Sequence, residues 1–171
     1  MVHNALAGIA VGYALGMKDE EIKAGIEALI PLAGRNNLIE TDSLTIIDDC
    51  YNANPASTRA SLDVLTKADT RRVAILGDMF ELGPTEKQMH YEVGKYAADL
   101  GIDVLVCIGQ LSEHMATGAS EQNSKTQVFY FETKEDFFTQ TDRVLNPKDT
   151  ILVKASNGMK FSEIVNILKE R

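Results

Sequence analysis

The stretch LTIIDDCYNANP, residues 44–55, marks the passage from a buried strand into a helix. Its first four residues are apolar or β-branched, and mostly polar residues follow up to Pro55. Proline fits the first turn of a helix, and Asn54 can cap that helix by accepting a hydrogen bond from an amide two or three residues further on. The stretch therefore predicts a strand, a polar turn and the start of a helix.

Along the rest of the chain, short apolar strands alternate with segments of helical periodicity. The strand candidates lie at residues 44–47, 73–76, 104–108, 128–131 and 151–153. Strands that are apolar along their whole length are typical of a parallel sheet buried on both faces. We therefore predict an α/β fold with a doubly wound, mostly parallel sheet and helices on both faces.

The first thirty residues follow a different pattern. Apolar residues recur there at helical spacing and predict two amphipathic helices, which are separated near Gly16. Pro31 and Gly34 then interrupt the helical pattern. Residues 31–37 are the predicted connection between a short helical segment, residues 1–33, and an α/β domain, residues 36–171.

The composition of the 171 residues is that of a globular domain of ordinary size, with 44% hydrophobic and 25% charged residues. A formal net charge of -8 disfavours binding to nucleic acid or to anionic lipid. No apolar run approaches the ~20 residues that cross a bilayer, and no basic segment leads into a signal sequence. The sequence favours a soluble cytoplasmic protein with no nucleic-acid partner and no membrane insertion.

Cysteine and histidine residues are few and widely spaced. Cys50 and Cys107 lie far apart in apolar surroundings, which favours free thiols in a reducing compartment over a disulfide. His3, His90 and His114 have no Cys or acidic neighbours at the spacing of a zinc site. We predict no metal site in this chain and no catalytic role for the histidines.

Polar residues follow the predicted strands at the places where each strand ends. Ligands of open α/β sheets bind outside the carboxyl ends of the strands, so these residues form a candidate ligand rim. They lie at residues 48–55, 77–78, 109–110 and 154–157. Within residues 77–78, Asp78 is predicted to cap or bond locally in a tight turn.

Three features of this rim bear on ligand binding. Because side chains alternate along a strand, Asp48 and Asp49 should point in opposite directions, and we favour Asp49 as the one that faces a ligand. Lys154 emerges from a buried strand, where it is placed to neutralise a carboxylate or a phosphate. Asn52 and Asn54 could contact a ligand, or they could serve the turn and the helix cap.

Two common nucleotide motifs are missing from these 171 residues. Neither the GxxxxGK[ST] phosphate loop nor the GxGxxG dinucleotide fingerprint occurs. The residues alone therefore lead to an α/β domain with a polar ligand rim and no evident means of activating a nucleoside triphosphate.

An ordered series of motifs runs through the whole chain, at residues 4–7 (NALA), 34–35 (GR), 47–57 (IDDCYNANPAS), 76–83 (LGDMFELG), 90–94 (HYEVG) and 153–157 (VKASN). In this order they resemble the landmarks of the Mur ligase family, and in particular of its branch that adds D-alanyl-D-alanine. The DDxYNANP and LGDMxELG motifs are specific to this branch, whereas NALA is shared across the family.

The resemblance implies a three-domain enzyme of peptidoglycan synthesis, in which this chain would hold the last helices of a central ATPase domain and a Rossmann-like carboxyl-terminal domain. It implies ATP and Mg²⁺ held mainly by the central domain, with Asn4, Arg35 and Asp49 of this chain near the ATP. The other substrates would be UDP-N-acetylmuramoyl-tripeptide and D-alanyl-D-alanine. The residues that face the dipeptide would be Asn52, Asn54, Lys154, Ser156 and Asn157.

The departures from the family pattern concern catalysis. The phosphate loop, the magnesium-binding acid and the bridging lysine of the family do not occur in this sequence, and the histidine that usually precedes NALA is not in its place. We therefore assign no catalytic residue to this chain and expect it to be inactive without the other two domains.

Three alternatives remain at this point. A receiver-like signalling domain shares the paired acids and the lysine, but residues 109–110 (GQ) replace its phosphoacceptor aspartate. A folylpolyglutamate-synthase-like ligase domain shares the architecture, but Asn52 lies in the motif that carries a histidine there. The third alternative is a non-enzymatic α/β binding module.

Overall fold

The computed structural model describes residues 2–28 and 34–171, which belong to two compact units. The first unit contains α1 (Val2–Ala14) and α2 (Asp19–Glu27), with Gly16 at a φ of +73° between them. The two predicted amino-terminal helices are thus confirmed. The predicted connection, residues 31–37, lies partly outside the described residues. In the described ranges, we find no helix with the length and apolarity needed to cross a membrane.

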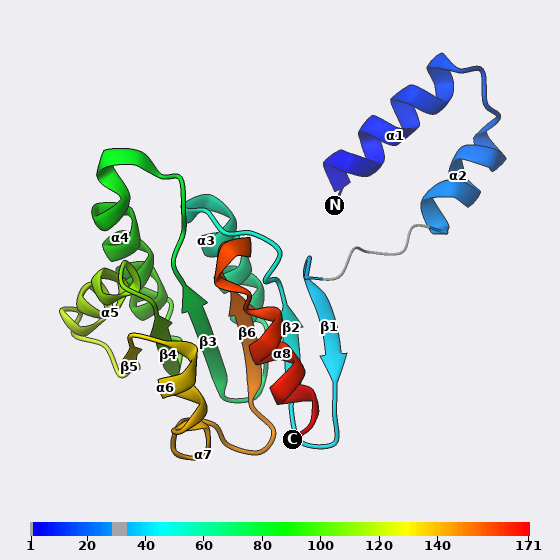
Figure 1. Cartoon of the computed structure of the whole chain (residues 1–171). Helices are drawn as coiled ribbons and strands as arrows, with labels where there is room; N and C mark the ends of the chain where they lie inside the picture. Colours follow the sequence, from blue (N-terminus) through cyan, green and yellow to red (C-terminus); the bar gives the residue numbers. More distant parts are fainter. Residues whose placement is uncertain (1, 29–33) are drawn as a thin grey trace. The chain divides into compact units, whose positions relative to one another are not determined.

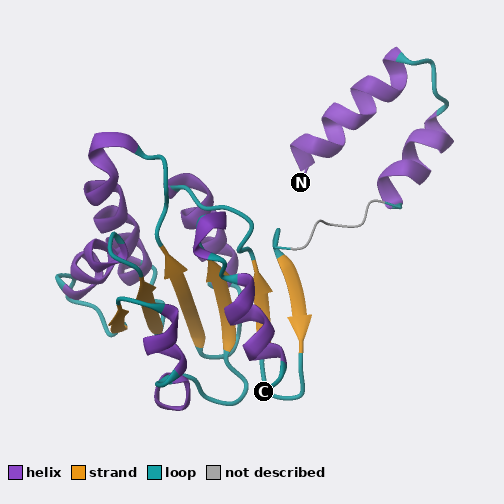
Figure 2. Cartoon of the chain, viewed as in Figure 1, coloured by secondary structure: helices purple, strands orange, loops and turns teal. Residues whose placement is uncertain are grey.

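The second unit is built on a six-stranded sheet, visible as arrows in Figures 1 and 2. The strand order is β1-β2-β6-β3-β4-β5, and all neighbours are parallel except β1 and β2. The predicted mostly parallel sheet is therefore confirmed. The strands are β1 (Asn37–Glu40), β2 (Thr45–Asp48), β3 (Arg72–Gly77), β4 (Val104–Ile108), β5 (Gln127–Phe131) and β6 (Thr150–Lys154).

Helices cover both faces of this sheet. One face carries α3 (Pro55–Leu65), α4 (Glu86–Asp99) and α5 (Ser112–Ser120), and the other carries α6 (Lys134–Phe138), α7 (Thr141–Val144) and α8 (Ser162–Lys169) (Figure 1). Two short 3₁₀ turns, η1 (Gly83–Thr85) and η2 (Asn157–Met159), complete the unit.

Strand β3 contributes side chains to the apolar clusters on both faces of the sheet. Its Val73 and Ile75 pack in the cluster with α6, α7 and α8, while Ala74 and Leu76 pack in the cluster with α3, α4 and α5. Because successive side chains point to opposite faces, a strand between two helical layers must be apolar throughout. The doubly wound fold predicted from the apolar strands is confirmed.

The start of α3 is also the one that the sequence predicts. The Asn54 side chain accepts a hydrogen bond from the Ser57 amide at 2.8 Å, the Ser57 hydroxyl accepts one from the Asn54 amide at 3.1 Å, and Pro55 is the first helical residue. This cap fixes the direction in which the chain leaves β2. It thereby places residues 49–54 at the carboxyl end of the sheet.

Strand β6 lies between β2 and β3, although it is the last strand in the chain. After β3 the chain passes to α4 on one face, and after β6 it passes to α8 on the other face. The loops after β3 and β6 therefore diverge, and such a switch point is where open α/β sheets bind ligands.

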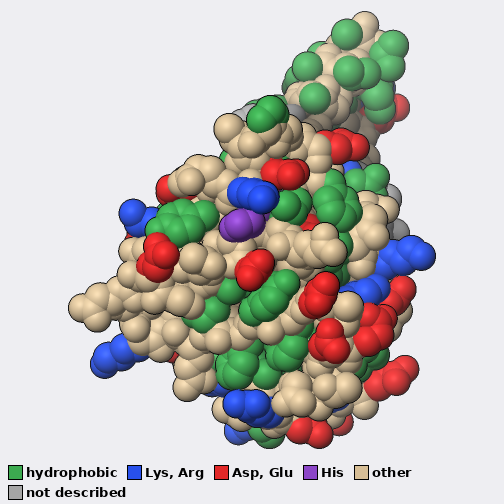
Figure 3. Space-filling model, turned by 60° about the vertical axis from the view of Figure 1, so that its left-hand side comes forward, with side chains coloured by type: hydrophobic (Ala, Val, Ile, Leu, Met, Phe, Trp, Pro, Cys, Tyr) green, Lys and Arg blue, Asp and Glu red, His purple; other side chains and the backbone are tan. Residues whose placement is uncertain are grey.

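Figure 3 shows one face of the chain, on which acidic and basic side chains are interspersed. Both signs of charge are therefore present on this face, while the formal net charge of the chain is -8.

Candidate functional site

A cleft of about 340 Å³ lies at the carboxyl ends of β2, β3 and β6. Three of the predicted substrate residues, Asn52, Ser156 and Asn157, lie together in its lining. The remaining lining residues had no role predicted from the sequence, and they are Tyr51, Phe80, Glu81 and Gly158. Phe80 and Glu81 belong to the LGDMFELG motif. Their place just after a buried parallel strand is the signal that could have identified them.

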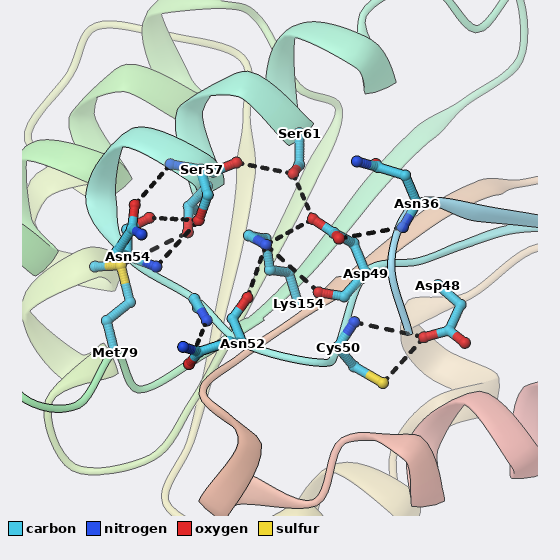
Figure 4. Close-up of polar contacts among 12 residues, drawn as sticks. Asn36, Asp48, Asp49, Cys50, Asn52, Asn54, Ser57, Ser61, Met79 and Lys154 are labelled. Atoms are coloured by element: carbon cyan, nitrogen blue, oxygen red, sulfur yellow. Dashed lines mark hydrogen bonds and ion pairs between the residues drawn. The ribbon is translucent and has the colours of Figure 1, made fainter. Parts of the chain in front are cut away.

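A buried ion pair between Asp49 and Lys154 ties β6 to the loop after β2 (Figure 4). The Lys154 ammonium lies 2.6 Å from Oδ2 of Asp49 and also donates to the Asn52 carbonyl oxygen at 2.9 Å. The Ser61 hydroxyl donates to the same Oδ2 at 2.6 Å, and the Asn36 amide donates to Oδ1 at 3.2 Å. These bonds offset the cost of removing both charges from water.

Lys154 thus neutralises a carboxylate, as predicted, and that carboxylate is the one of Asp49. Only 3% of the lysine side chain is exposed, and its ammonium already has three acceptors: Oδ2 of Asp49, the Asn52 carbonyl oxygen and, at 3.5 Å, the Asp49 carbonyl oxygen. Direct contact between Lys154 and a substrate stays a prediction.

Asp48 and Asp49 point in opposite directions, as strand alternation predicts (Figure 4). The Asp48 carboxylate accepts hydrogen bonds from the Cys50 thiol at 3.0 Å and from the Cys50 amide at 3.4 Å. Burial and the hydrogen bond to Asp48 together raise the pKa of the Cys50 thiol to about 12. The thiol therefore stays protonated near neutral pH and is a poor nucleophile.

Arg35 lies next to this site. Its guanidinium group is 4.3 Å from the centre of the Tyr51 ring, and the neighbouring Asn36 amide holds Asp49. The Gly34 carbonyl oxygen accepts from the Tyr51 amide at 2.9 Å, and a Cβ atom on Gly34 would lie only 3.1 Å from that nitrogen. The structure thus places Arg35 over the Tyr51 ring, next in the chain to the residue whose amide bonds Asp49.

Asn4, the third residue predicted near ATP, lies on the exposed surface of α1 in the separate first unit. Its contact with a nucleotide stays a prediction.

For Asn52 and Asn54, the structure supports the turn and cap roles. Asn54 caps α3, and the Asn52 side chain accepts from the Ala53 amide at 2.9 Å. Asn52 also lines the cleft, while Asn54 is not among the lining residues. The Asn157 side chain donates to the Tyr51 carbonyl oxygen at 3.1 Å, which joins the loops after β2 and β6.

The prediction that Asp78 bonds locally is wrong. Its Oδ1 accepts from the Ser112 amide at 2.8 Å and from the Ser112 hydroxyl at 2.7 Å, so it joins β3 to the start of α5. A Cβ atom on Gly109, which has a φ of +116°, would lie 2.6 Å from this carboxylate. Sequence patterns do not show which helix start lies beside a strand end, because that depends on the strand order.

His90 is fully buried in α4 and bonds with both ring nitrogens. Its Nε2 accepts from the Met79 amide at 2.9 Å, and its Nδ1 lies 2.7 Å from the Glu86 carbonyl oxygen. Burial lowers the pKa of His90, which favours the neutral ring. His114 lies on α5, and we find no group of three His, Cys, Asp or Glu side chains in the described ranges that could hold a metal ion.

Comparison with known proteins places these motifs in a family. Residues 34–157 match the family model "Mur ligase, glutamate ligase domain". The chain is 37% identical over 172 residues to the UDP-N-acetylmuramoyl-tripeptide–D-alanyl-D-alanine ligase of Bacillus subtilis, a match that covers 99% of this chain and 38% of that protein. The chain thus spans less than two fifths of the length of this relative.

Solved structures agree with this comparison. MurF from Acinetobacter baumannii superimposes with a TM-score of 0.85 at 32% identity, over 98% of this chain and 37% of that one. MurF from Thermotoga maritima, solved in complex with ADP, has a TM-score of 0.75 at 22% identity, over 95% of this chain and 36% of that one. At this lower identity the second likeness concerns the fold alone.

Proposed function

Since this chain belongs to the Mur ligase family, we propose that it is the carboxyl-terminal part of a ligase that adds D-alanyl-D-alanine to UDP-N-acetylmuramoyl-tripeptide in peptidoglycan synthesis. The observation that carries this proposal is the match to the Bacillus subtilis ligase of that name over 99% of the chain. In this proposal residues 1–33 end a central ATPase domain, and residues 36–171 form the carboxyl-terminal domain.

The cleft between β2, β3 and β6 is the proposed site of the dipeptide. Ser156, Asn157 and Asn52 supply polar groups to its lining, and Phe80 and Tyr51 supply aromatic surface. A cleft that combines polar groups with aromatic surface suits a small peptide, because the polar groups fix its orientation. Lys154 supports the cleft from behind by holding the Asp49–Asn52 turn.

ATP is the proposed source of energy, and this chain would contribute Arg35, Asp49 and Asn4 to its site. The Arg35 side chain is exposed beside the Tyr51 ring, and an exposed guanidinium group suits phosphate oxygens. Oδ1 of Asp49 bonds only the Asn36 amide among the described residues, so it retains acceptor capacity for a ribose hydroxyl. The central domain would hold the triphosphate and Mg²⁺.

The proposed reaction has two steps. The γ-phosphoryl group of ATP passes to the tripeptide carboxylate, and the amine of D-alanyl-D-alanine then displaces inorganic phosphate to form the amide bond. This chain would bind and orient the amine component, and closure of the domains would exclude water from the acyl phosphate. Buried free thiols at Cys50 and Cys107 support a cytoplasmic location.

The test is a ligation assay on the full-length enzyme that carries this chain. Phosphate release should require ATP, Mg²⁺, UDP-N-acetylmuramoyl-tripeptide and D-alanyl-D-alanine together, and the 171-residue chain alone should release none. Acceptance of glutamate in place of D-alanyl-D-alanine would instead support the folylpolyglutamate-synthase-like alternative. Labelling of the isolated chain by acetyl phosphate would support the receiver-like alternative.

A further inference from the structure

The segment after β3, residues 79–81, forms one wall of the cleft and is called the cleft wall below. Phe80 and Glu81 line the cleft, opposite Ser156 and Gly158 from the loop after β6. The wall lies close to that loop, because a Cβ atom on Gly158 would lie 3.1 Å from the Phe80 ring. The position of the cleft wall therefore sets the width of the cleft.

Glu81 is distinguished within the cleft by charge and by backbone conformation. It alone is charged among the described residues that line the cleft. Its carboxylate forms no hydrogen bond or ion pair with any residue that the structure describes. Its φ of +63° lies in the left-handed region, which costs energy for a residue other than glycine and is often found at functional sites.

Hydrogen bonds from buried groups hold the cleft wall in this conformation. The Met79 amide donates to Nε2 of His90 at 2.9 Å, and the Phe80 amide donates to the Ser156 hydroxyl at 2.8 Å. The Ser156 amide in turn donates to the Asp78 carbonyl oxygen at 3.0 Å. Two consecutive amides of the wall are therefore fixed by side chains from α4 and from the loop after β6.

The bond between Met79 and His90 depends on the state of the imidazole. Because Nδ1 lies 2.7 Å from the Glu86 carbonyl oxygen, Nδ1 carries the hydrogen and Nε2 is free to accept. A protonated ring would have no acceptor for the Met79 amide. The charged or titratable groups that act on the ring are Asp78, Glu86 and His114.

We propose that Glu81 binds the ammonium group of the incoming amino substrate, and that His90 is a positioning residue that holds Glu81 at the cleft. This inference rests on the proposed function. The amine of a dipeptide is an ammonium ion near neutral pH, and a carboxylate in an otherwise neutral cleft is its complementary group. The same contact orients the amino group in the cleft.

The first test replaces Glu81 by Gln in the full-length ligase, which removes the charge and keeps the size. The KM for D-alanyl-D-alanine should rise roughly ten- to a hundredfold, because hydrogen bonds to charged groups are strong, while the KM for ATP should stay unchanged. Glu132→Gln is the matched control, since Glu132 is an exposed acid after β5 that does not line the cleft.

A substrate analogue distinguishes the contribution of the ammonium charge to binding from the contribution of the shape of the dipeptide. The dipeptide analogue with a hydroxyl group in place of the amino group has no ammonium ion, so its inhibition constant should hardly differ between wild type and Glu81→Gln. A loss of analogue binding equal to the loss of dipeptide binding would overturn the assignment of the ammonium contact to Glu81.

The positioning role is tested with two substitutions of His90. His90→Leu removes the acceptor for the Met79 amide and should raise the KM for the dipeptide in the same direction as Glu81→Gln. His90→Gln keeps an acceptor oxygen and should restore most of the wild-type KM. If His90→Leu fails to fold, His90→Gln still decides: an unchanged KM supports the role of this acceptor, and a KM as high as that of Glu81→Gln contradicts it.

Failure of this inference can be told from failure of the proposed function. A wild-type enzyme that does not ligate D-alanyl-D-alanine would overturn the proposed function and the inference with it. An active wild-type enzyme whose dipeptide KM is insensitive to Glu81→Gln would overturn the inference alone.

Discussion

Lys154→Met removes the positive charge from the buried ion pair and leaves the Asp49 carboxylate in place. Breaking a buried pair in this way costs ~3 to 5 kcal/mol, because the remaining charge is no longer compensated. The Ser61 hydroxyl and the Asn36 amide still donate to Asp49, so we expect the lower end of that range, about 3 kcal/mol. A domain of ordinary stability survives such a loss.

The assay is urea unfolding of the 171-residue chain. With a slope of about 2 kcal/mol per molar urea, the midpoint should fall by about 1.5 M. Lys134→Met is the control, since the ammonium of Lys134 also lies 2.6 Å from a carboxylate oxygen, that of Glu163, whose side chain is 51% exposed. An exposed pair contributes little, so this midpoint should hardly move.

Two results would refute the reasoning. In the first, Lys154→Met would lower the midpoint no more than Lys134→Met does, and the burial of the pair would then be unimportant. In the second, the double variant of Lys154→Met and Asp49→Asn would show the simple sum of the single losses. We expect less than the sum, because neither charge remains unpaired when both are removed.

Three further predictions concern the same end of the sheet. In the full-length ligase, Asp49→Asn should raise the KM for ATP roughly ten- to a hundredfold and Asp48→Asn should do much less, so steady-state kinetics that show the reverse would contradict the ribose assignment. Because burial lowers the pKa of His90 in the folded chain, the unfolded chain takes up this proton first. Stability due to neutral His90 should be complete above about pH 6.5 and decline below it, and urea midpoints at several pH values should show a flatter profile for His90→Gln. Asn54→Ala should destabilise the chain by about 1 kcal/mol through loss of the α3 cap, and calorimetry that shows no change would contradict the assigned cap.

The sequence alone was sufficient for features that depend on neighbouring residues. The five apolar strands, the cap at Asn54 with Pro55 after it, and the opposite directions of Asp48 and Asp49 all follow from local periodicity and local hydrogen bonding. The edge strand β1 was missed, because its central Leu38 and Ile39 are too few to give a strand pattern. Its formation depends on antiparallel pairing with β2.

Only the tertiary structure decided which of these features meet. Lys154 and Asp49 are 105 residues apart in the sequence, and they pair because β6 inserts between β2 and β3. The same strand order puts Glu81 opposite Ser156 and sets His90 beneath the cleft wall. Periodicity specifies the face on which a side chain lies, but it contains no information on strand order. That order is fixed by long-range packing of the two apolar clusters, so periodicity alone could not show that Phe80 and Glu81 complete the cleft.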